Sequence, residues 1–127
     1  MAKIEKGLLY TEDHEWLKVD GEYGYVGLSD FAQHQLGDIV YIELPDVDEE
    51  YEIGESIGSV ESVKTAADIN IPVSGVVVEI NEDLDAEPEK VNEDPYETWI
   101  CKIKINDNAE VEDLMTDSQY EDFCEEA

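Results

Sequence analysis

Arginine is absent from this sequence, and its seven lysines stand against 35 aspartate and glutamate residues, for a formal net charge of −28. Such an excess of negative charge repels phosphate backbones and anionic lipid surfaces, so we expect no nucleic-acid partner and no membrane partner. The acidity has two open interpretations. One is adaptation to a salt-rich cytosol, because the Debye length at 1 M salt is only ~3 Å. The other is the ordinary solubility of an acidic protein.

Cysteine and histidine are also scarce, with two residues of each. Cys101 and Cys124 stand far apart without a C-x-x-C motif, and neither His14 nor His34 lies in a metal-ligand spacing such as H-E-x-x-H. We therefore expect no metal site, and we interpret both thiols as packing residues.

Long apolar runs are missing as well. No stretch reaches the roughly 18 consecutive apolar residues of a membrane span, and the N-terminus has no cationic segment followed by an apolar one. We expect a soluble, cytoplasmic protein. A chain of 127 residues with 42% hydrophobic content can bury one core of ordinary size but hardly two, which predicts a single domain over residues 1–127.

Short β-prone runs separated by Gly, Asp and Pro make up most of the chain, which is the spacing typical of a sandwich or barrel. The Asp20-Gly21 pair supplies the positive φ angles of a tight turn, so strands should flank it. We predict strands over residues 16–19, 23–28, 38–44, 56–63, 65–71, 75–80 and 98–105. In the last of these, Trp99, Cys101, Ile103 and Ile105 should face inward.

Helical signals occur in two places. Residues 29–36 have Ser29 as a candidate N-cap and Gly37 just past the end, which predicts a short helix. The stretch from Asn108 predicts C-terminal helix, with cap signals at Asn108 and Ser118. Between them, the polar and Pro-punctuated residues 81–96 indicate a loop with one helical turn.

Lys64 is the strongest candidate for chemistry. It lies between two predicted strands, and therefore at the tip of a hairpin. A lysine in a turn is usually a solvated charge or a guard against edge pairing. Here the neighbours are small, which leaves room for an enzyme to grip the hairpin and acylate the amine: Ser62, Thr65, Ala66 and Ala67.

The segment ESVKTAAD at residues 61–68 resembles the lipoylation segment of the glycine cleavage H-protein family, whose central lysine corresponds to Lys64. Other stretches similar to that family follow in the right order from about residue 7 to residue 120: YTEDHEW at 10–16, VGLSDFAQ at 26–33, LGD at 36–38, ELP at 43–45, PVSG at 72–75 and VNEDPY at 91–96. One departure follows Tyr96, where the loop before Trp99 is one residue shorter and lacks the family's glycine. Without glycine the backbone there does not readily take positive φ, so the local turn must differ.

The resemblance implies a mainly β fold, a flattened β-barrel sandwich of the lipoyl/biotinyl type with short helices and a C-terminal helix. It also implies a carrier and not an enzyme. Lipoate would be amide-linked to Lys64 and would pass the aminomethyl group of glycine between partners, with the protein supplying position and protection. The implied partners are a pyridoxal-phosphate-dependent glycine decarboxylase, a tetrahydrofolate-dependent aminomethyltransferase, lipoamide dehydrogenase, and a lipoate ligase or lipoyl transferase.

Asp13, Glu15 and Asp68 are the candidates for docking the arm, because the resemblance places the His-Glu-Trp stretch near the resting arm and Asp68 lies four residues past Lys64. With 35 acidic residues in the chain, the plainer interpretation of any three is surface charge. His14 is equally compatible with a structural hydrogen bond and with a functional role.

Three alternatives stay open at the level of sequence. A lipoyl or biotinyl domain of another multienzyme complex shares the hairpin-tip lysine, but biotin carriers flank it with methionines, and neither Met1 nor Met115 is near Lys64. A lipoyl domain of a 2-oxo acid dehydrogenase would lack the His-Glu-Trp segment and the C-terminal helix. A lipoyl-relay protein would use the same Lys64, and an unmodified scaffold would retain the fold.

Overall fold

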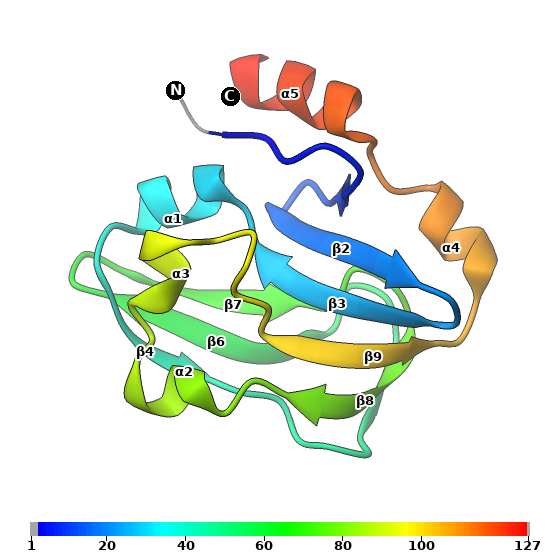
Figure 1. Cartoon of the computed structure of the whole chain (residues 1–127), viewed down its shortest axis with the longest axis horizontal. Coiled ribbons are helices and arrows are strands. Elements are labelled where there is room, and N and C mark those ends of the chain that lie inside the picture. The colour runs from blue at the N-terminus through cyan, green and yellow to red at the C-terminus, as the bar shows by residue number, and fades with distance from the viewer. Residues whose placement is uncertain (1–2, 127) are drawn as a thin grey trace.

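A computed structural model describes residues 3–126 of the chain. Its strands and helices follow one another along the chain as Figure 1 labels them. The strands are β1 (Leu9–Tyr10), β2 (Glu15–Asp20), β3 (Tyr23–Leu28), β4 (Ile39–Glu43), β5 (Glu50–Tyr51), β6 (Ser56–Ser62), β7 (Ala66–Asn70), β8 (Gly75–Ile80) and β9 (Cys101–Ile105). The helices are α1 (Asp30–Leu36), α2 (Asp83–Ala86), α3 (Lys90–Glu93), α4 (Asn108–Glu112) and α5 (Asp117–Glu126).

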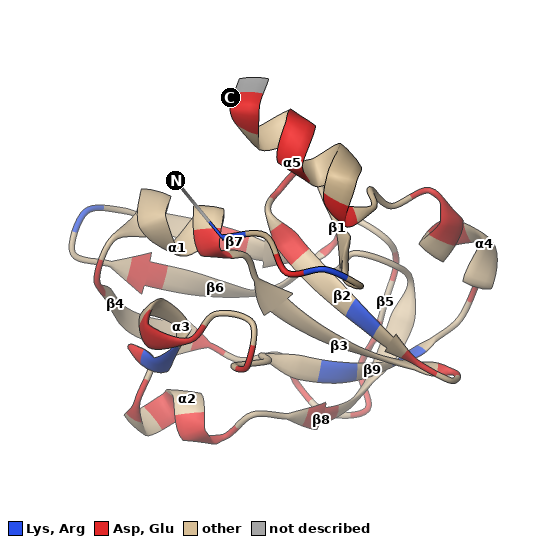
Figure 2. Ribbon diagram, turned by 45° about the horizontal axis from the view of Figure 1, so that its top comes forward, with Lys and Arg blue, Asp and Glu red and all other residues tan. Residues whose placement is uncertain are grey.

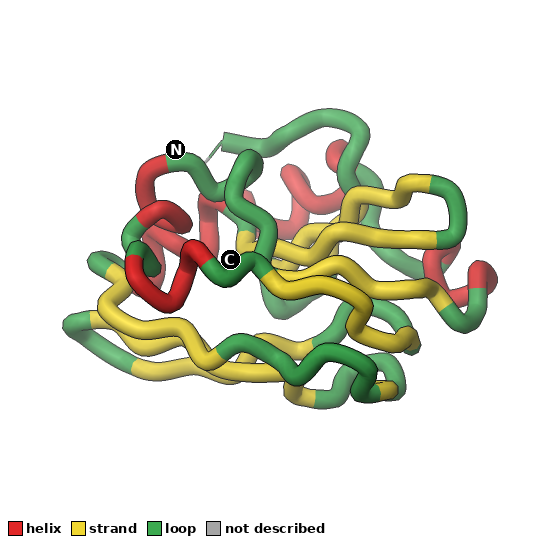
Figure 3. Tube along the Cα trace, turned by 60° about the horizontal axis from the view of Figure 1, so that its bottom comes forward, coloured by secondary structure: helices red, strands yellow, loops and turns green. Residues whose placement is uncertain are grey.

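The strands form two antiparallel sheets. The larger has the order β1-β2-β3-β9-β8-β5, and the smaller has the order β4-β6-β7. The two sheets lie over each other as layers (Figure 3), and their inner faces share one core to which the larger sheet contributes Val26 and Ile103 and the smaller contributes Val60 and Ile69. The predicted mainly β sandwich with short helices and a C-terminal helix is thereby confirmed.

The alternation along β9 directs Cys101, Ile103 and Ile105 into this core, as predicted, while Trp99 is half-buried and packs in a second cluster. That second cluster lies on the other face of β2, where Trp16 packs with Tyr10 of β1 and Tyr120 of α5. The Trp16 ring lies against Gly27, where a Cβ would be 2.4 Å from the ring atom Cε2. Its indole N–H donates to the carbonyl oxygens of Leu28 and Pro95, both at 3.1 Å.

Several boundaries differ from the prediction. Two single-turn helices, α2 and α3, occupy residues 81–96, where we expected one turn, because Leu84 and Val91 are fully buried and anchor them to the core. Asp107, and not Asn108, caps α4 by accepting the N–H of Ala109. Thr116, and not Ser118, caps α5 through a reciprocal pair in which Gln119 N–H donates to Thr116 Oγ1 and Thr116 N–H donates to Gln119 Oε1.

Acidic residues occur on every helix and on most strands, with the few lysines scattered among them (Figure 2). After Tyr96 the shortened loop forms a turn in which the N–H groups of Glu97 and Thr98 donate to the carbonyl of Asp94. No residue of that turn has positive φ, in agreement with the loss of glycine. No helix among residues 3–126 is long and apolar enough to span a membrane.

Candidate functional site

Lys64 lies at the tip of the hairpin between β6 and β7, and its side chain is exposed. Ser62 builds the turn: its backbone N–H donates to the carbonyl of Thr65 at 2.8 Å, and its hydroxyl oxygen accepts the N–H groups of Lys64 at 3.2 Å and Thr65 at 3.1 Å. The turn is also tied to the residue before β4, because the Val63 N–H donates to the carbonyl of Asp38 at 3.0 Å.

The Lys64 side chain folds back over the end of α1. At Gly37, where φ is +79°, a Cβ would lie 2.9 Å from Lys64 Cε, so the absence of a side chain allows this approach. Gly37 also closes the helix, since its N–H donates to the carbonyl of Gln33 at 2.9 Å. The stem of Lys64 thus lies against Gly37. Any L-residue at position 37 would have a strained backbone, and its Cβ would clash with the lysine stem.

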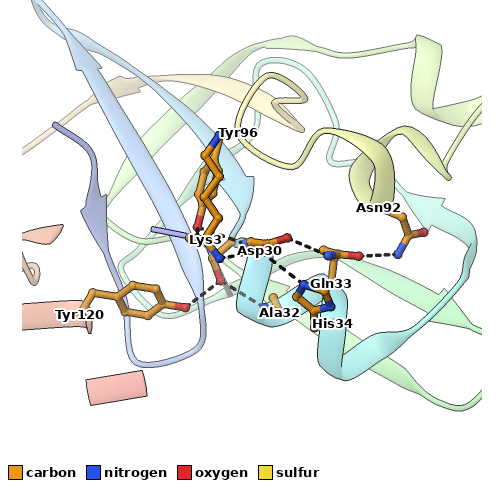
Figure 4. Close-up of polar contacts among 9 residues, drawn as sticks. Lys3, Asp30, Ala32, Gln33, His34, Asn92, Tyr96 and Tyr120 are labelled. Atoms are coloured by element: carbon orange, nitrogen blue, oxygen red, sulfur yellow. Dashed lines mark hydrogen bonds and ion pairs between the residues drawn. The ribbon is translucent and has the colours of Figure 1, made fainter. Parts of the chain in front are cut away.

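The position of α1 is fixed by polar contacts at both ends (Figure 4). At its start, Asp30 accepts the Lys3 N–H at 2.6 Å and pairs with His34 at 3.3 Å. At its end, the Asn92 amide of α3 donates to Gln33 Oε1 at 3.0 Å and to the carbonyl of Gly37 at 2.8 Å. The end of α1 under Lys64 is therefore held by Asn92 of α3.

A cavity of about 490 Å³ opens beside Lys64, between α1, the start of β2, and the hairpin strands. Its apolar lining includes Leu28, Leu36 and Val60, and its acidic lining consists of Asp13, Glu15 and Asp68. The remaining lining residues are His14, Ala32, Gln35, Thr65, Ala66 and Ala67. A small site of mostly apolar walls with a few charged groups suits a flexible apolar chain that ends in a cation. The three acidic residues chosen from the sequence are thus brought to one cavity.

Glu15 is the buried member of this set, with only 1% of its surface exposed. Its carboxylate accepts the Thr11 hydroxyl at 2.6 Å and the Asn70 N–H at 3.2 Å. Burial raises the pKa of Glu15 from 4.5 to about 7 against the opposing effect of these hydrogen bonds, and the nearby Asp13 carboxylate raises it further. At neutral pH Glu15 is therefore close to half-protonated and responsive to any charge placed beside it.

Asn70 links the acidic residues across the open edge between the sheets. Its side-chain amide donates to Asp13 Oδ2 at 3.2 Å while its backbone N–H donates to Glu15. Asn70 was not among the residues predicted for the site. Its one signal was its position two residues after Asp68 on the same strand, which places both side chains on one face.

The model of the family described as "Glycine cleavage H-protein" matches residues 8–127. The chain belongs to the glycine cleavage H-protein family. Curated relatives named glycine cleavage system H protein include one from Alkaliphilus oremlandii, 51% identical over 97% of each chain, and one from Carboxydothermus hydrogenoformans, 50% identical over 99% of this chain and 98% of its own length.

The fold agrees with a solved member of the family. The crystal structure of a glycine cleavage system H protein from Mycobacterium marinum matches with a TM-score of 0.84 and 36% identity, over 92% of this chain and 95% of that one. The resemblance seen in the sequence is therefore confirmed, and the relatives extend over the His-Glu-Trp segment and the C-terminal helices alike. This full-length match favours an H protein over a lipoyl module of another complex.

Proposed function

We propose that this chain, as one domain over residues 1–127, is a lipoyl-lysine carrier of the glycine cleavage system, with lipoate amide-linked to Lys64. The observation that carries the proposal is the placement of Lys64: an exposed amine at a hairpin tip, with its stem across Gly37 and beside a cavity that holds three carboxylates. Family membership supports the same function.

The proposed partners are the pyridoxal-phosphate-dependent glycine decarboxylase, the tetrahydrofolate-dependent aminomethyltransferase and lipoamide dehydrogenase, with a lipoate ligase or lipoyl transferase attaching the cofactor. Lipoate attached to Lys64 would supply a cyclic disulfide that is reduced as it accepts the aminomethyl group, and lipoamide dehydrogenase would oxidise the dithiol that remains after the group is released. A tethered arm replaces diffusional encounters by a high effective concentration at each partner. The chain itself is the carrier subunit and no enzyme of the cycle.

The cavity would shelter the cationic end of the arm. A charged amine that leaves bulk water needs acceptors, because an unpaired buried charge is costly. Glu15 and Asp68 offer carboxylate oxygens for charge-assisted hydrogen bonds, and Asp13 adds negative charge at the rim. The apolar side chains of Leu36 and Val60 would exclude water from the part of the cavity along which the arm lies. Ionisation of Glu15 by the incoming cation would strengthen the pairing, since its pKa lies near neutrality.

The attachment site is tested by expressing the protein with a lipoate ligase and mapping the adduct by intact-protein and peptide mass spectrometry. We expect one lipoyl group, on Lys64, and none on Lys64→Arg. Lys104→Arg is the matched control, because Lys104 is also exposed but lies on β9 of the other sheet. An adduct on another lysine, or full modification of Lys64→Arg, would contradict the proposal.

Glycine–bicarbonate exchange separates this function from a lipoyl relay. The lipoylated protein should support exchange with the glycine decarboxylase in proportion to its concentration. A lipoylated protein that gives no exchange but donates its lipoyl group to another acceptor would be a relay.

A further inference from the structure

Tyr120 of α5 reaches from the C-terminal helix to the cavity wall. Its side chain is fully buried and stacks on Tyr10 with a centroid distance of 4.2 Å and an interplanar angle of 1°. Its hydroxyl lies 2.7 Å from Nδ1 of His14 and 2.7 Å from Oγ of Ser29. One phenol thus joins the last helix to the start of β2 and to the N-cap of α1.

The direction of these hydrogen bonds follows from Ser29. Its Oγ accepts the N–H of Ala32 as the N-cap of α1, and the residue is fully buried. If Tyr120 donated to Ser29, the buried serine proton would have no acceptor among the described residues, which is costly. Ser29 therefore donates to Tyr120. The phenol oxygen lies 2.7 Å from Nδ1 of His14, and donation to that nitrogen gives the buried phenol proton an acceptor as well. The ring proton of a neutral His14 must then sit on Nε2.

His14 is held in a strained backbone conformation. Its φ is +70°, and Asp48 is the one other non-glycine residue with positive φ among residues 3–126. Its carbonyl accepts the Ser29 N–H at 2.9 Å, and its ring stacks on Phe31 with a centroid distance of 4.4 Å. Strain of this kind persists only where the surroundings enforce it, and it occurs often at functional sites. Here the residue held in this way is one of those that line the cavity.

The charge of His14 matters because a cation is expected next to it. Burial lowers the pKa of His14, and the neighbouring Asp13 carboxylate only partly opposes this. The other groups that face the ring are uncharged or aromatic: the Tyr120 hydroxyl, Phe31 and Phe123. Near neutral pH, this side of the cavity carries no positive charge that would compete with an amine for Glu15.

We propose that Tyr120 is a positioning residue that fixes His14 as a rigid, uncharged wall of the arm cavity, so that helix α5 controls how well the arm is sheltered. This inference rests on the proposed function for its last clause. A purely structural role for the Tyr120 hydroxyl, as an anchor of α5, would predict a loss of stability with no specific effect on His14 or on the arm.

The test compares Tyr120→Phe with Tyr10→Phe. Each variant removes one hydroxyl from the same stacked pair, but the Tyr10 hydroxyl bonds to the carbonyl of Glu5 and does not reach His14. Nitrogen-15 spectra of the imidazoles in the unmodified protein should show a single Nε2–H tautomer of His14 in the wild type and in Tyr10→Phe. In Tyr120→Phe the two nitrogen shifts should move toward the averaged values of a free neutral imidazole. Exposed His34 serves as the internal reference.

The second readout is the lifetime of the aminomethyl group on the lipoylated protein. The protein is loaded with glycine and the decarboxylase, the enzyme is removed, and the release of formaldehyde is measured over time. Release should be roughly fivefold faster in Tyr120→Phe, the ratio that loss of one average hydrogen bond produces. His14→Asn should also release formaldehyde faster, and asparagine is chosen because it tolerates positive φ. The double variant should be no worse than His14→Asn alone, because Tyr120 acts through His14.

An unchanged His14 spectrum in Tyr120→Phe would overturn the positioning role. Equal lifetimes in wild type and Tyr120→Phe, or an equal effect of Tyr10→Phe, would overturn control of the arm by α5. If the wild type accepts no lipoate, the proposed function fails instead, and the imidazole spectra still decide whether Tyr120 positions His14.

Discussion

Replacing Glu15 by Gln should make the protein more stable above neutral pH and less sensitive to pH. The substitution keeps the shape of the side chain. Its oxygen can accept the Asn70 N–H, and its amide can donate to Thr11 Oγ1, the two atoms that contact the carboxylate in the wild type. The variant removes only a buried carboxyl group, which in the wild type ionises as pH rises.

The magnitude follows from linkage. The pKa of Glu15 is about 7 in the folded chain, against an ordinary value of 4.5. Between these two values the folded state holds a proton that the unfolded state has lost, so the free energy of unfolding falls as pH rises. A difference of one pKa unit corresponds to 1.36 kcal/mol. Glu15 should therefore contribute about 3 kcal/mol to the free energy of unfolding, and this contribution is fully present below pH ~4.5 and lost by pH ~8.

The assay is denaturant unfolding of wild type and Glu15→Gln from about pH 5 to about pH 8 at fixed salt. The quantity to follow is the difference between the two free energies of unfolding, because the other carboxylates titrate equally in both proteins. We expect the wild type to lose most of the ~3 kcal/mol relative to the variant across this range. Parallel curves would refute the argument, since they would mean that Glu15 is solvated or already ionised in the fold.

Three further outcomes are expected. Sodium chloride should raise the melting temperature, because the Debye length of ~30 Å at 0.01 M exceeds a radius of gyration of roughly 14 Å; a flat curve would mean that the carboxylates are balanced locally. Thr116→Ala should cost about 1 kcal/mol by loss of the α5 cap, as measured by urea unfolding against Ser118→Ala, which should cost less. Glu15→Gln and Asp68→Asn should each release formaldehyde faster from the loaded protein, and lifetimes equal to wild type in both would place the arm elsewhere.

The strands were predictable wherever local chemistry determines them. The expected hairpin joins β2 and β3, with positive φ at Gly21 while Asp20 still pairs with Tyr23 in the sheet, and the alternation in β9 predicts its buried face. The two-residue strands β1 and β5 were missed, because so short a segment has no periodicity and exists only through its partner strand. The cap of α5 was misplaced by two residues, since Thr116 and Ser118 both carry a suitable hydroxyl and only the position of Gln119 selects between them.

The site was predictable in part. Lys64 has a local signal, a lysine among small residues between two strands, and the structure places it at the hairpin tip. Asp13 and Glu15 were selected from the family resemblance and Asp68 from its position four residues past Lys64, and the cavity that unites them depends on how β2 and β7 meet. Neither the burial of Glu15 nor the contact of Tyr120 with His14 has a local signal. Tyr120 and His14 are separated by 106 positions and meet only in the folded chain.

The burial of Trp16 has an optical consequence. Its indole is 2% exposed and hydrogen-bonded to two carbonyls, so its emission should be shielded from aqueous quenchers. The chain contains one other tryptophan, the half-buried Trp99, and Trp99→Phe would leave a single fluorophore. Because neighbouring side chains on a strand point to opposite faces, this fluorophore lies directly behind Glu15. Trp16 fluorescence should therefore report changes in the cavity from the opposite face of β2.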